Sequence, residues 1–199
     1  MAERSAIVLI GPMCAGKSTV AKLLAESLGV ENFAVDDHRW DYYEQTDYDK
    51  KKAARIIEAE GMVALLKYMK PFEAYAVEKI MAEKSNCVID FGAGHSVYED
   101  EGLFKRVQGA LADCENVILL LPSADLDEST QILNARFTEL LEREVGSVDP
   151  GLLDLNEHFV KQPSNHTLAK LVVYTNGKEP KETADEIIER LQLKERKVD

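Results

Sequence analysis

Residues 11–19 read GPMCAGKST and directly follow the apolar run AIVLI at 6–10. The spacing of Gly11, Gly16, Lys17 and Ser18 is that of a P-loop, whose glycine-rich backbone surrounds a polyphosphate with N–H groups. We expect Lys17 to reach the β- and γ-phosphates and the Ser18 hydroxyl to hold Mg²⁺. A strand-to-helix turn without a ligand is the alternative, but the apolar strand before the loop and the amphipathic helix predicted at 17–28 favour ATP binding. The predicted ATP contacts in this loop are Gly11, Pro12, Met13, Cys14, Ala15, Gly16, Lys17, Ser18 and Thr19.

Acidic side chains follow two further apolar segments. Asp36 and Asp37 lie after a predicted strand at 33–35, and Asp90 ends the run CVID at 87–90. Phosphoryl transfer depends on charge neutralisation and in-line positioning. We therefore predict that Asp36 orients the magnesium shell and accepts the proton of the attacking hydroxyl, while Asp37 hydrogen-bonds the acceptor. Asp90 would contact the shell as a Walker-B-like acid, which makes Ser18, Asp36 and Asp90 the predicted metal-site residues. Asp36 and Asp37 could exchange roles, or the pair could simply cap a helix.

The elements that must position these residues alternate along the chain. Strands are predicted at 6–10, 33–35, 87–90, 117–121 and 171–175, and helices at 17–28, 48–84, 98–113, 129–144 and 182–193. Apolar strands joined by helices favour a parallel sheet that is covered on both faces. Ligands bind at the carboxyl ends of the strands in such α/β folds, so the P-loop and the acids are expected to meet there.

The composition excludes several classes of protein. The 199 residues carry a formal net charge of −12, which argues against a general nucleic-acid binder or a protein of anionic membrane surfaces. The three cysteines are odd in number and form no CxxC pair, so neither a zinc site nor a disulfide framework is indicated. The apolar runs are too short to span a bilayer, and no signal peptide is recognised. We expect one domain, 1–199, that is monomeric and cytoplasmic.

With these pieces in place, the chain resembles the shikimate kinase group of P-loop kinases, within the nucleoside-monophosphate-kinase-like family. The resemblance rests on GPMCAGKST, on the turn VIDFGAG after the third strand and on YTNGKEPKETADEI near the end of the chain. It implies a three-layer α/β/α P-loop NTPase fold with strand order 2-3-1-4-5. It also implies a substrate-binding helical insert at about 38–84, a lid at about 136–160, and an adenine-side loop that includes Lys178 and Pro180.

The sequence departs from that group where the substrate binds. Shikimate kinases carry Asp-x-Asp after the second strand, whereas the acids here are adjacent. Leu66 stands where the group has an arginine for the substrate carboxylate, and the three-glycine turn is replaced by Gly92-Ala93-Gly94 followed by His95. Lys161 takes the place of an arginine before the fifth strand, which keeps the charge but loses the forked geometry. These departures predict an acceptor other than shikimate.

Further candidates come from the remaining cations and polar groups. Arg136 and Arg143 lie seven residues apart on one predicted helical face of the lid, where they could act catalytically on the γ-phosphate or be ordinary surface charges. His95 could bind a substrate hydroxyl or be structural, and Trp40 could wall the acceptor pocket or anchor the insert. The residues predicted to bind the acceptor are Asp37, Arg39, Gly92, Ala93, Gly94, His95 and Lys161.

The sequence favours an ATP- and Mg²⁺-dependent kinase that phosphorylates a hydroxyl of a small metabolite. The alternatives are a nucleoside, sugar or antibiotic phosphotransferase and a non-catalytic ATP-sensing module. The acids at 36 and 37 favour an enzyme, because a sensor needs no base beside the γ-phosphate.

Overall fold

Five parallel strands form one sheet in the order β2-β3-β1-β4-β5 in the computed structural model, which describes residues 5–148 and 150–193. Val8 at the centre of the sheet lies opposite Ile89 on one neighbour and Val117 on the other. The predicted order 2-3-1-4-5 is confirmed. Residues 1–4, 149 and 194–199 belong to the predicted domain 1–199, and 149 also to the predicted lid, but they lie outside the described residues. The strands are β1 (Ile7–Ile10), β2 (Glu31–Ala34), β3 (Cys87–Asp90), β4 (Asn116–Leu121) and β5 (Leu171–Tyr174).

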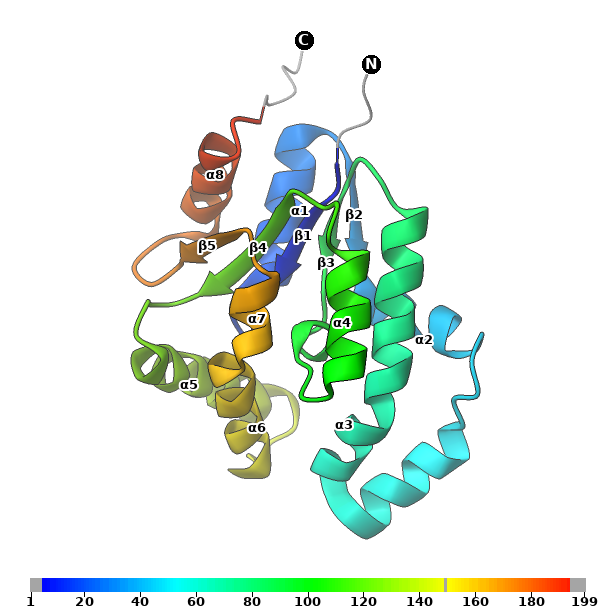
Figure 1. Cartoon of the computed structure of the whole chain (residues 1–199). Helices are drawn as coiled ribbons and strands as arrows, with labels where there is room; N and C mark the ends of the chain where they lie inside the picture. Colours follow the sequence, from blue (N-terminus) through cyan, green and yellow to red (C-terminus); the bar gives the residue numbers. More distant parts are fainter. Residues whose placement is uncertain (1–4, 149, 194–199) are drawn as a thin grey trace.

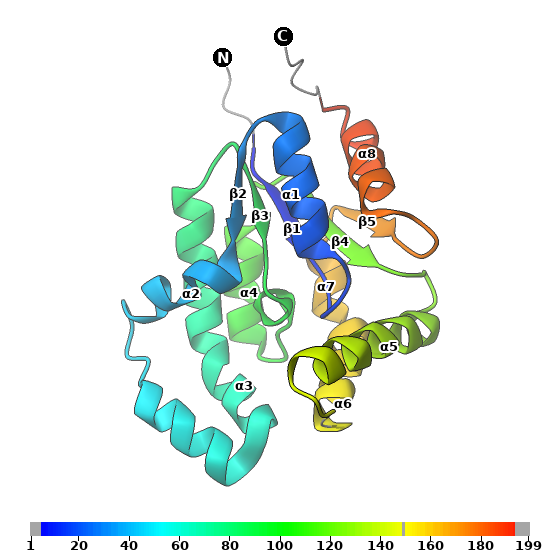
Figure 2. The ribbon, with the colours of Figure 1, turned by 180° about the vertical axis from the view of Figure 1, so that it is seen from behind.

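Helices cover both faces of the sheet and thus complete the three predicted layers. In Figure 1, α3, α4 and α7 lie in front of the sheet, and Figure 2 shows α1 and α8 packed side by side on the opposite face. The helices are α1 (Lys17–Leu28), α2 (Val35–Tyr43), α3 (Lys50–Glu83), the short 3-10 helix η1 (Ala93–Ser96), α4 (Glu101–Ala110), α5 (Leu126–Glu144), α6 (Pro150–Lys161), α7 (Pro163–Leu168) and α8 (Pro180–Arg190).

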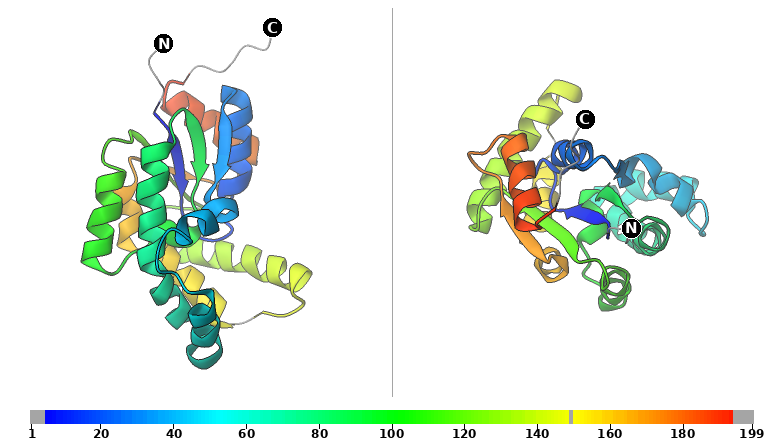
Figure 3. Two further views of the ribbon diagram at one scale, coloured as in Figure 1. Left: turned by 90° about the vertical axis from the view of Figure 1, so that its right-hand side faces the viewer. Right: turned by 90° about the horizontal axis from the view of Figure 1, so that it is seen from above.

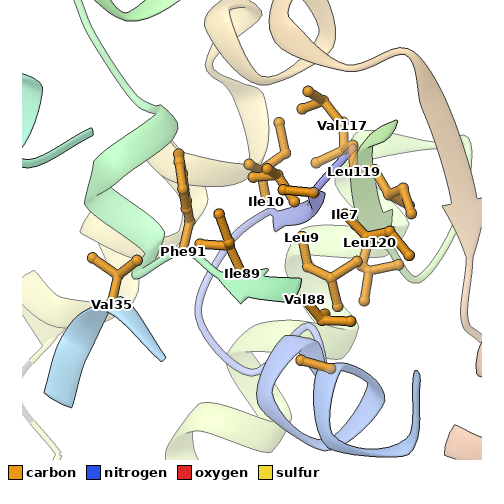
Figure 4. Packing of buried hydrophobic residues seen from close by; sticks show 14 of the residues in the cluster. Ile7, Leu9, Ile10, Val35, Val88, Ile89, Phe91, Val117, Leu119 and Leu120 are labelled. Atoms are coloured by element: carbon orange, nitrogen blue, oxygen red, sulfur yellow. The ribbon is translucent and has the colours of Figure 1, made fainter. Parts of the chain in front are cut away.

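The core lies on both sides of the central strands. Val8, Leu9 and Ile10 of β1 are fully buried, as are residues 117–120 of β4. Figure 4 shows labelled side chains of β1 (Leu9, Ile10) and β4 (Val117, Leu119, Leu120) in one cluster with Val88, Ile89 and Phe91 of the neighbouring strand and its extension. Strands that are buried on both faces explain why the sequence shows continuous apolar runs rather than alternation. Among the described residues, no helix combines the length and the apolar character needed to cross a bilayer.

Two arms extend beyond the carboxyl ends of the strands. One arm contains α2 and the first half of α3, which bends at Gly61, where φ is +83°. The other is a hairpin of α5 and α6, and Figure 2 shows the loop after β1 between the two arms. The predicted insert at 38–84 spans most of α2 and all of α3, so only its first part lies on the first arm, and the predicted lid at 136–160 spans the end of α5 and most of α6.

The predicted elements differ from the observed ones at several ends. The second strand was expected at 33–35, but pairing with β3 begins at Glu31, and Val35 already opens α2. Asp36 and Asp37 therefore lie in the first turn of a helix, where the helix dipole stabilises negatively charged side chains. The single helix predicted at 48–84 is interrupted at Gly61, whose backbone is not helical. Residues with an L side chain rarely adopt such a positive φ, which glycine tolerates. Helices α6 and α7 were not predicted.

Candidate active site

The loop after β1 has the geometry of a phosphate site. Gly11 has a φ of +140°, and a Cβ there would lie 2.6 Å from the carbonyl oxygen of Leu120. Gly16 has a φ of +90° and precedes the first turn of α1, which contains Ser18 and Thr19. Within the described residues, no side chain caps α1 and no acid occupies its first turn. Its N-terminal amides are therefore available to an anion.

Lys17 lies across this loop rather than in solvent. The residue is buried, and its Nζ donates a hydrogen bond to the carbonyl oxygen of Pro12 at 2.9 Å. Burial lowers the pKa of Lys17, and the carboxylates of Asp90 and Asp36 oppose that shift. The ammonium group therefore lies in the field of two predicted site acids, although 73 positions separate Lys17 from Asp90 along the chain.

Asp90 offers a carboxylate that suits a hydrated cation. Its side chain is buried, and Oδ1 has no hydrogen-bond partner among the described residues. Burial raises the pKa of Asp90, while the Lys17 ammonium and a hydrogen bond from Ser18 lower it. Magnesium favours oxygen ligands and retains several waters, so Ser18 and a buried acid with a free oxygen fit this ion. No cluster of three or more His, Cys, Asp or Glu side chains suited to a metal occurs in the described part of the chain.

A cavity of about 560 Å³ adjoins the phosphate loop through Met13 and is the candidate acceptor cavity. It opens between α2, the first half of α3, η1 and α6, on the arms seen side-on in the left view of Figure 3. Its polar lining comes from Asp36, Arg39, Tyr48, Lys50, Glu73 and the turn Gly92, Ala93, Gly94, His95. Its apolar lining includes Trp40, Ile57, Met62, Leu66, Leu155 and Phe159.

Asp36 and Asp37 differ in their position relative to the cavity. Asp36 lines the cavity and accepts a hydrogen bond from Nη1 of Arg39 at 3.1 Å. A Cβ on Gly92 would overlap Oδ1 of Asp36 and lie 2.8 Å from Nδ1 of His95, so the glycine allows both side chains to approach. Asp37 is exposed and is not among the lining residues of the cavity, although its charge acts on Asp90.

His95 is a buried member of the cavity lining. It is 1% exposed, its Nε2 lies 3.4 Å from the Tyr43 hydroxyl, and Nδ1 has no partner among the described residues. Burial lowers the pKa of His95, and the carboxylates of Glu73 and Asp36 oppose the shift. Burial therefore favours the neutral imidazole.

Sequence reasoning missed Glu73 and Lys70. Glu73 is buried at 3% exposure, pairs with Nζ of Lys70 at 2.7 Å, and lies against Gly94. Lys70 also donates to the carbonyl oxygen of Gly94 at 2.8 Å. In the sequence, this i, i+3 pair of opposite charges resembles a solvent-exposed helix face. Only the turn after β3, which is distant in sequence, reveals that Glu73 is buried and Lys70 half-buried.

The predicted cations of the lid occupy different environments. Burial raises the pKa of the Cys14 thiol, and Lys17 and Arg136 oppose the shift, so the charge of Arg136 acts on the phosphate loop. Both arginines are exposed, and Arg143 pairs with the adjacent Glu144 at 3.3 Å. Lys161 pairs with Asp127 and Glu157, each at 2.7 Å, and is not among the residues that line the acceptor cavity.

The predicted adenine-side residues lie between β5 and α8. Lys178 donates to the carbonyl oxygen of Tyr174 at 2.8 Å and pairs with Glu186, while Pro180 is the first residue of α8. Lys178 therefore lies in the loop that follows the carboxyl end of β5.

A parallel sheet of this order, with a phosphate loop after β1 and an acceptor cavity beside it, defines the chain as a P-loop kinase. The family described as "AAA domain" matches residues 7–146. The shikimate kinase of Streptomyces coelicolor is 30% identical over 201 residues, which cover 95% of this chain and 96% of the relative. The chain therefore belongs to this family and to the shikimate kinase-like P-loop kinases, and it is a small-molecule kinase.

Two further comparisons agree in fold or in part of the sequence. The shikimate kinase of Aquifex aeolicus is 34% identical, but over 103 residues only, so the chain spans 55% of that relative. The solved structure of shikimate kinase from Acinetobacter baumannii in complex with shikimate has a TM-score of 0.67 and 21% identity. That match covers 95% of this chain and 93% of the other. At this identity the structural likeness shows the fold alone.

Proposed function

We propose that the protein transfers the γ-phosphoryl group of ATP to a hydroxyl of a small acceptor bound in the acceptor cavity. The observation that carries this proposal is the position of Asp36. Its carboxylate lines the cavity and also acts electrostatically on the P-loop lysine Lys17. A carboxylate between the phosphate site and an acceptor pocket is placed to orient the attacking hydroxyl and take its proton. A non-catalytic ATP sensor would need neither the cavity nor the acid.

The chain's own groups divide the work of phosphoryl transfer. The loop amides and Lys17 hold and neutralise the phosphates, and Lys178 with Pro180 borders the adenine side. Ser18, Asp90 and Asp36 would hold Mg²⁺, which when bound neutralises charge that develops on the phosphate oxygens. Arg136 approaches the loop from α5 and would add charge on closure of the arm, whereas Asp37 lies outside the cavity and serves through its field at Asp90.

Shikimate is proposed to be a poor acceptor. Leu66 lines the cavity at the position where shikimate kinases carry their carboxylate-binding arginine, and Lys161 is engaged by Asp127 and Glu157. Loss of a charge-assisted partner costs a carboxylate about 1.5–3 kcal/mol. We therefore expect an acceptor other than shikimate. A monomeric state and a cytoplasmic location also remain our expectations for this chain.

The test is ADP release from MgATP with a panel of hydroxyl compounds. Lys17→Ala is expected to abolish acceptor-dependent release with the fold intact, because Lys17 serves the phosphates rather than the core. Lys22→Ala, an exposed change on the same helix, is the matched control. Near-normal turnover by Lys17→Ala at saturating acceptor would contradict the proposed phosphoryl transfer. Efficient phosphorylation of shikimate would contradict the proposal that shikimate is a poor acceptor.

A further inference from the structure

The polar groups of the acceptor cavity form one contiguous cluster. Asp36 contacts Arg39 and the turn at Gly92, and Glu73 lies against Gly94 of the same turn. The walls beyond this cluster come from α6, from Trp40 and Tyr48, and from the first half of α3, and they are almost entirely apolar. The cavity is thus amphipathic, with its polar side at the strand ends.

The charges of the cavity are already paired. Among the described lining residues, the cations are Arg39, which pairs with Asp36 at 3.1 Å, and Lys50, which pairs with Glu44 at 2.7 Å. Glu73 is paired with Lys70. A carboxylated acceptor would be repelled by the carboxylates of Asp36 and Glu73. Each lining cation already pairs with an acid, and the remaining donor is Nε of Arg39, which has no hydrogen-bond partner among the described residues. A compound with many hydroxyls would leave several of them unpaired against apolar walls, at about 1–3 kcal/mol each.

Apolar side chains are exposed where this cavity opens. Trp40, Ile57 and Met62 line it and are 36%, 40% and 37% exposed, so half of the six large hydrophobic side chains exposed in the described structure gather here. A group of exposed apolar side chains in a hollow marks a binding surface more often than chance. The Arg39 guanidinium lies 4.8 Å from the centroid of the Trp40 ring, and the Tyr48 ring lies 5.6 Å from Trp40 at an interplanar angle of 40°, so two aromatic rings line this side of the cavity.

We propose that the acceptor is a neutral, ring-bearing alcohol with an apolar body and no carboxylate. This inference rests on the proposed function and narrows its substrate class. The hydroxyl would lie at Asp36, and the ring would cover Trp40 and the side chains of α3 and α6. A volume of about 560 Å³ suits such a ligand, because pockets for drug-sized molecules span about 300–1,000 Å³.

The chain carries its own reporter for this test, because Trp40 is its only tryptophan and lines the cavity. Tryptophan fluorescence is titrated in the presence of a non-hydrolysable ATP analogue with two matched pairs of probes. The first pair is 4-methylbenzyl alcohol against 4-(hydroxymethyl)benzoate, and the second is cyclohexanol against myo-inositol. We expect the neutral, apolar member of each pair to bind roughly tenfold more tightly, which corresponds to about 1.4 kcal/mol.

Leu66→Arg reverses the chemistry of the wall and is the diagnostic variant. The variant is expected to bind 4-methylbenzyl alcohol more weakly and 4-(hydroxymethyl)benzoate more tightly than the wild type does. The order of the two affinities should therefore invert. Val145→Arg adds the same charge at an exposed apolar residue outside the cavity and should leave the order unchanged. Circular dichroism of both variants confirms that the fold is kept.

The outcomes separate the inference from the proposed function. The inference is overturned if the wild type binds the neutral probes no more tightly than their counterparts, or if Leu66→Arg leaves the order intact. Lys17-dependent ADP release with a carboxylated or polyhydroxylated acceptor, in preference to the neutral alcohols, overturns the inference while the kinase proposal stands. Tight binding of the neutral alcohols without ADP release from any acceptor supports the inference and counts against the kinase proposal.

Discussion

Oδ1 of Asn156 accepts a hydrogen bond from the backbone N–H of Met13 at 3.1 Å, although 143 positions separate the two residues. Asn156 is fully buried, and its Nδ2 donates to Oδ1 of Asn134 at 3.1 Å. Asn134 in turn donates to the carbonyl oxygen of Leu153 at 3.3 Å. One asparagine of α6 therefore ties the phosphate loop to both helices of the hairpin that contains the predicted lid.

Asn156→Ala is expected to lower both stability and activity. The substitution leaves the Met13 N–H and Oδ1 of Asn134 without their hydrogen-bond partners, which costs about 1–3 kcal/mol. The KM for ATP should rise as well, because the loop amides lose their anchor. Urea unfolding and ATP titration measure the two effects, and Gln108→Ala, an exposed position on α4, is the control. An unchanged unfolding midpoint and an unchanged KM in Asn156→Ala would show that the Asn156–Met13 hydrogen bond contributes neither to stability nor to ATP binding.

Gly11→Ala should destabilise the protein strongly. Its Cβ would meet the Leu120 carbonyl oxygen at 2.6 Å, and its φ of +140° is unfavourable for alanine, so we expect a loss of about 1–3 kcal/mol or more. Gly109→Ala on α4 is the matched control, because no atom lies within 4 Å of the new Cβ. That change should instead stabilise by up to about 1 kcal/mol, since alanine favours a helix over glycine. Thermal unfolding of the two variants compares them, and equal midpoints would contradict this account.

The local pattern of the sequence predicts the parts of the site that are contiguous in the chain. The P-loop, helix α1 at 17–28 and strand β3 at 87–90 have the predicted bounds, because each combines an apolar period with a clear boundary residue. Helix α6 was missed because Pro150 and Gly151 indicate a turn. Proline is nevertheless tolerated in the first turn of a helix, and Leu155 and Phe159 then face the acceptor cavity.

The remaining site residues depend on contacts between distant segments. Asn156 and Glu73 carry no motif, and their roles follow only from the approach of Met13 and Gly94. The distinction between Asp36 and Asp37 likewise depends on the direction in which each side chain leaves the first turn of α2. The sequence places the end of the second strand one residue too late, at 35. The directions of the following side chains could not be predicted from it, because successive side chains alternate across a strand but rotate around a helix.

The stability of the protein should fall in mildly acidic solution in a way that depends on His95. Burial lowers the pKa of His95 in the folded state below its ordinary value of 6.5. Below that pH the unfolded chain binds a proton that the folded protein does not, so the free energy of unfolding decreases as pH falls. The slope contributed by one such group approaches about 1.4 kcal/mol per pH unit.

His95→Gln tests this dependence, because glutamine keeps a polar group near Tyr43 but cannot titrate. The variant should lose less stability than the wild type between neutral pH and mildly acidic pH. His166→Gln, an exposed change on α7, should behave like the wild type. Urea unfolding at a series of pH values gives the slopes, and parallel slopes for the wild type and His95→Gln would rule out a buried neutral imidazole.

The last prediction concerns the catalytic charge of the α5–α6 arm. Hydrolysis of ATP by water is the side reaction that closure of a kinase suppresses. If Arg136 approaches the γ-phosphate on closure, its charge acts on the transition state more than on ATP binding. Arg136→Ala should lower kcat by roughly a hundredfold, on the scale of losing one transition-state donor, with a much smaller change in the Kd for ATP. Arg143→Ala should have the smaller effect of the two, because Arg143 pairs with Glu144, whereas the charge of Arg136 acts on Cys14 of the phosphate loop.

Calorimetry for ATP affinity and single-turnover rates separate these effects, with Lys105→Ala on α4 as a control for loss of an exposed positive charge. A fall in ATP affinity that accounts for the whole loss in Arg136→Ala would assign the residue to ground-state binding. Unchanged rates in both arginine variants would mean that neither charge reaches the transferred group, and that the loop amides and Lys17 carry the transition state without a cation from the arm.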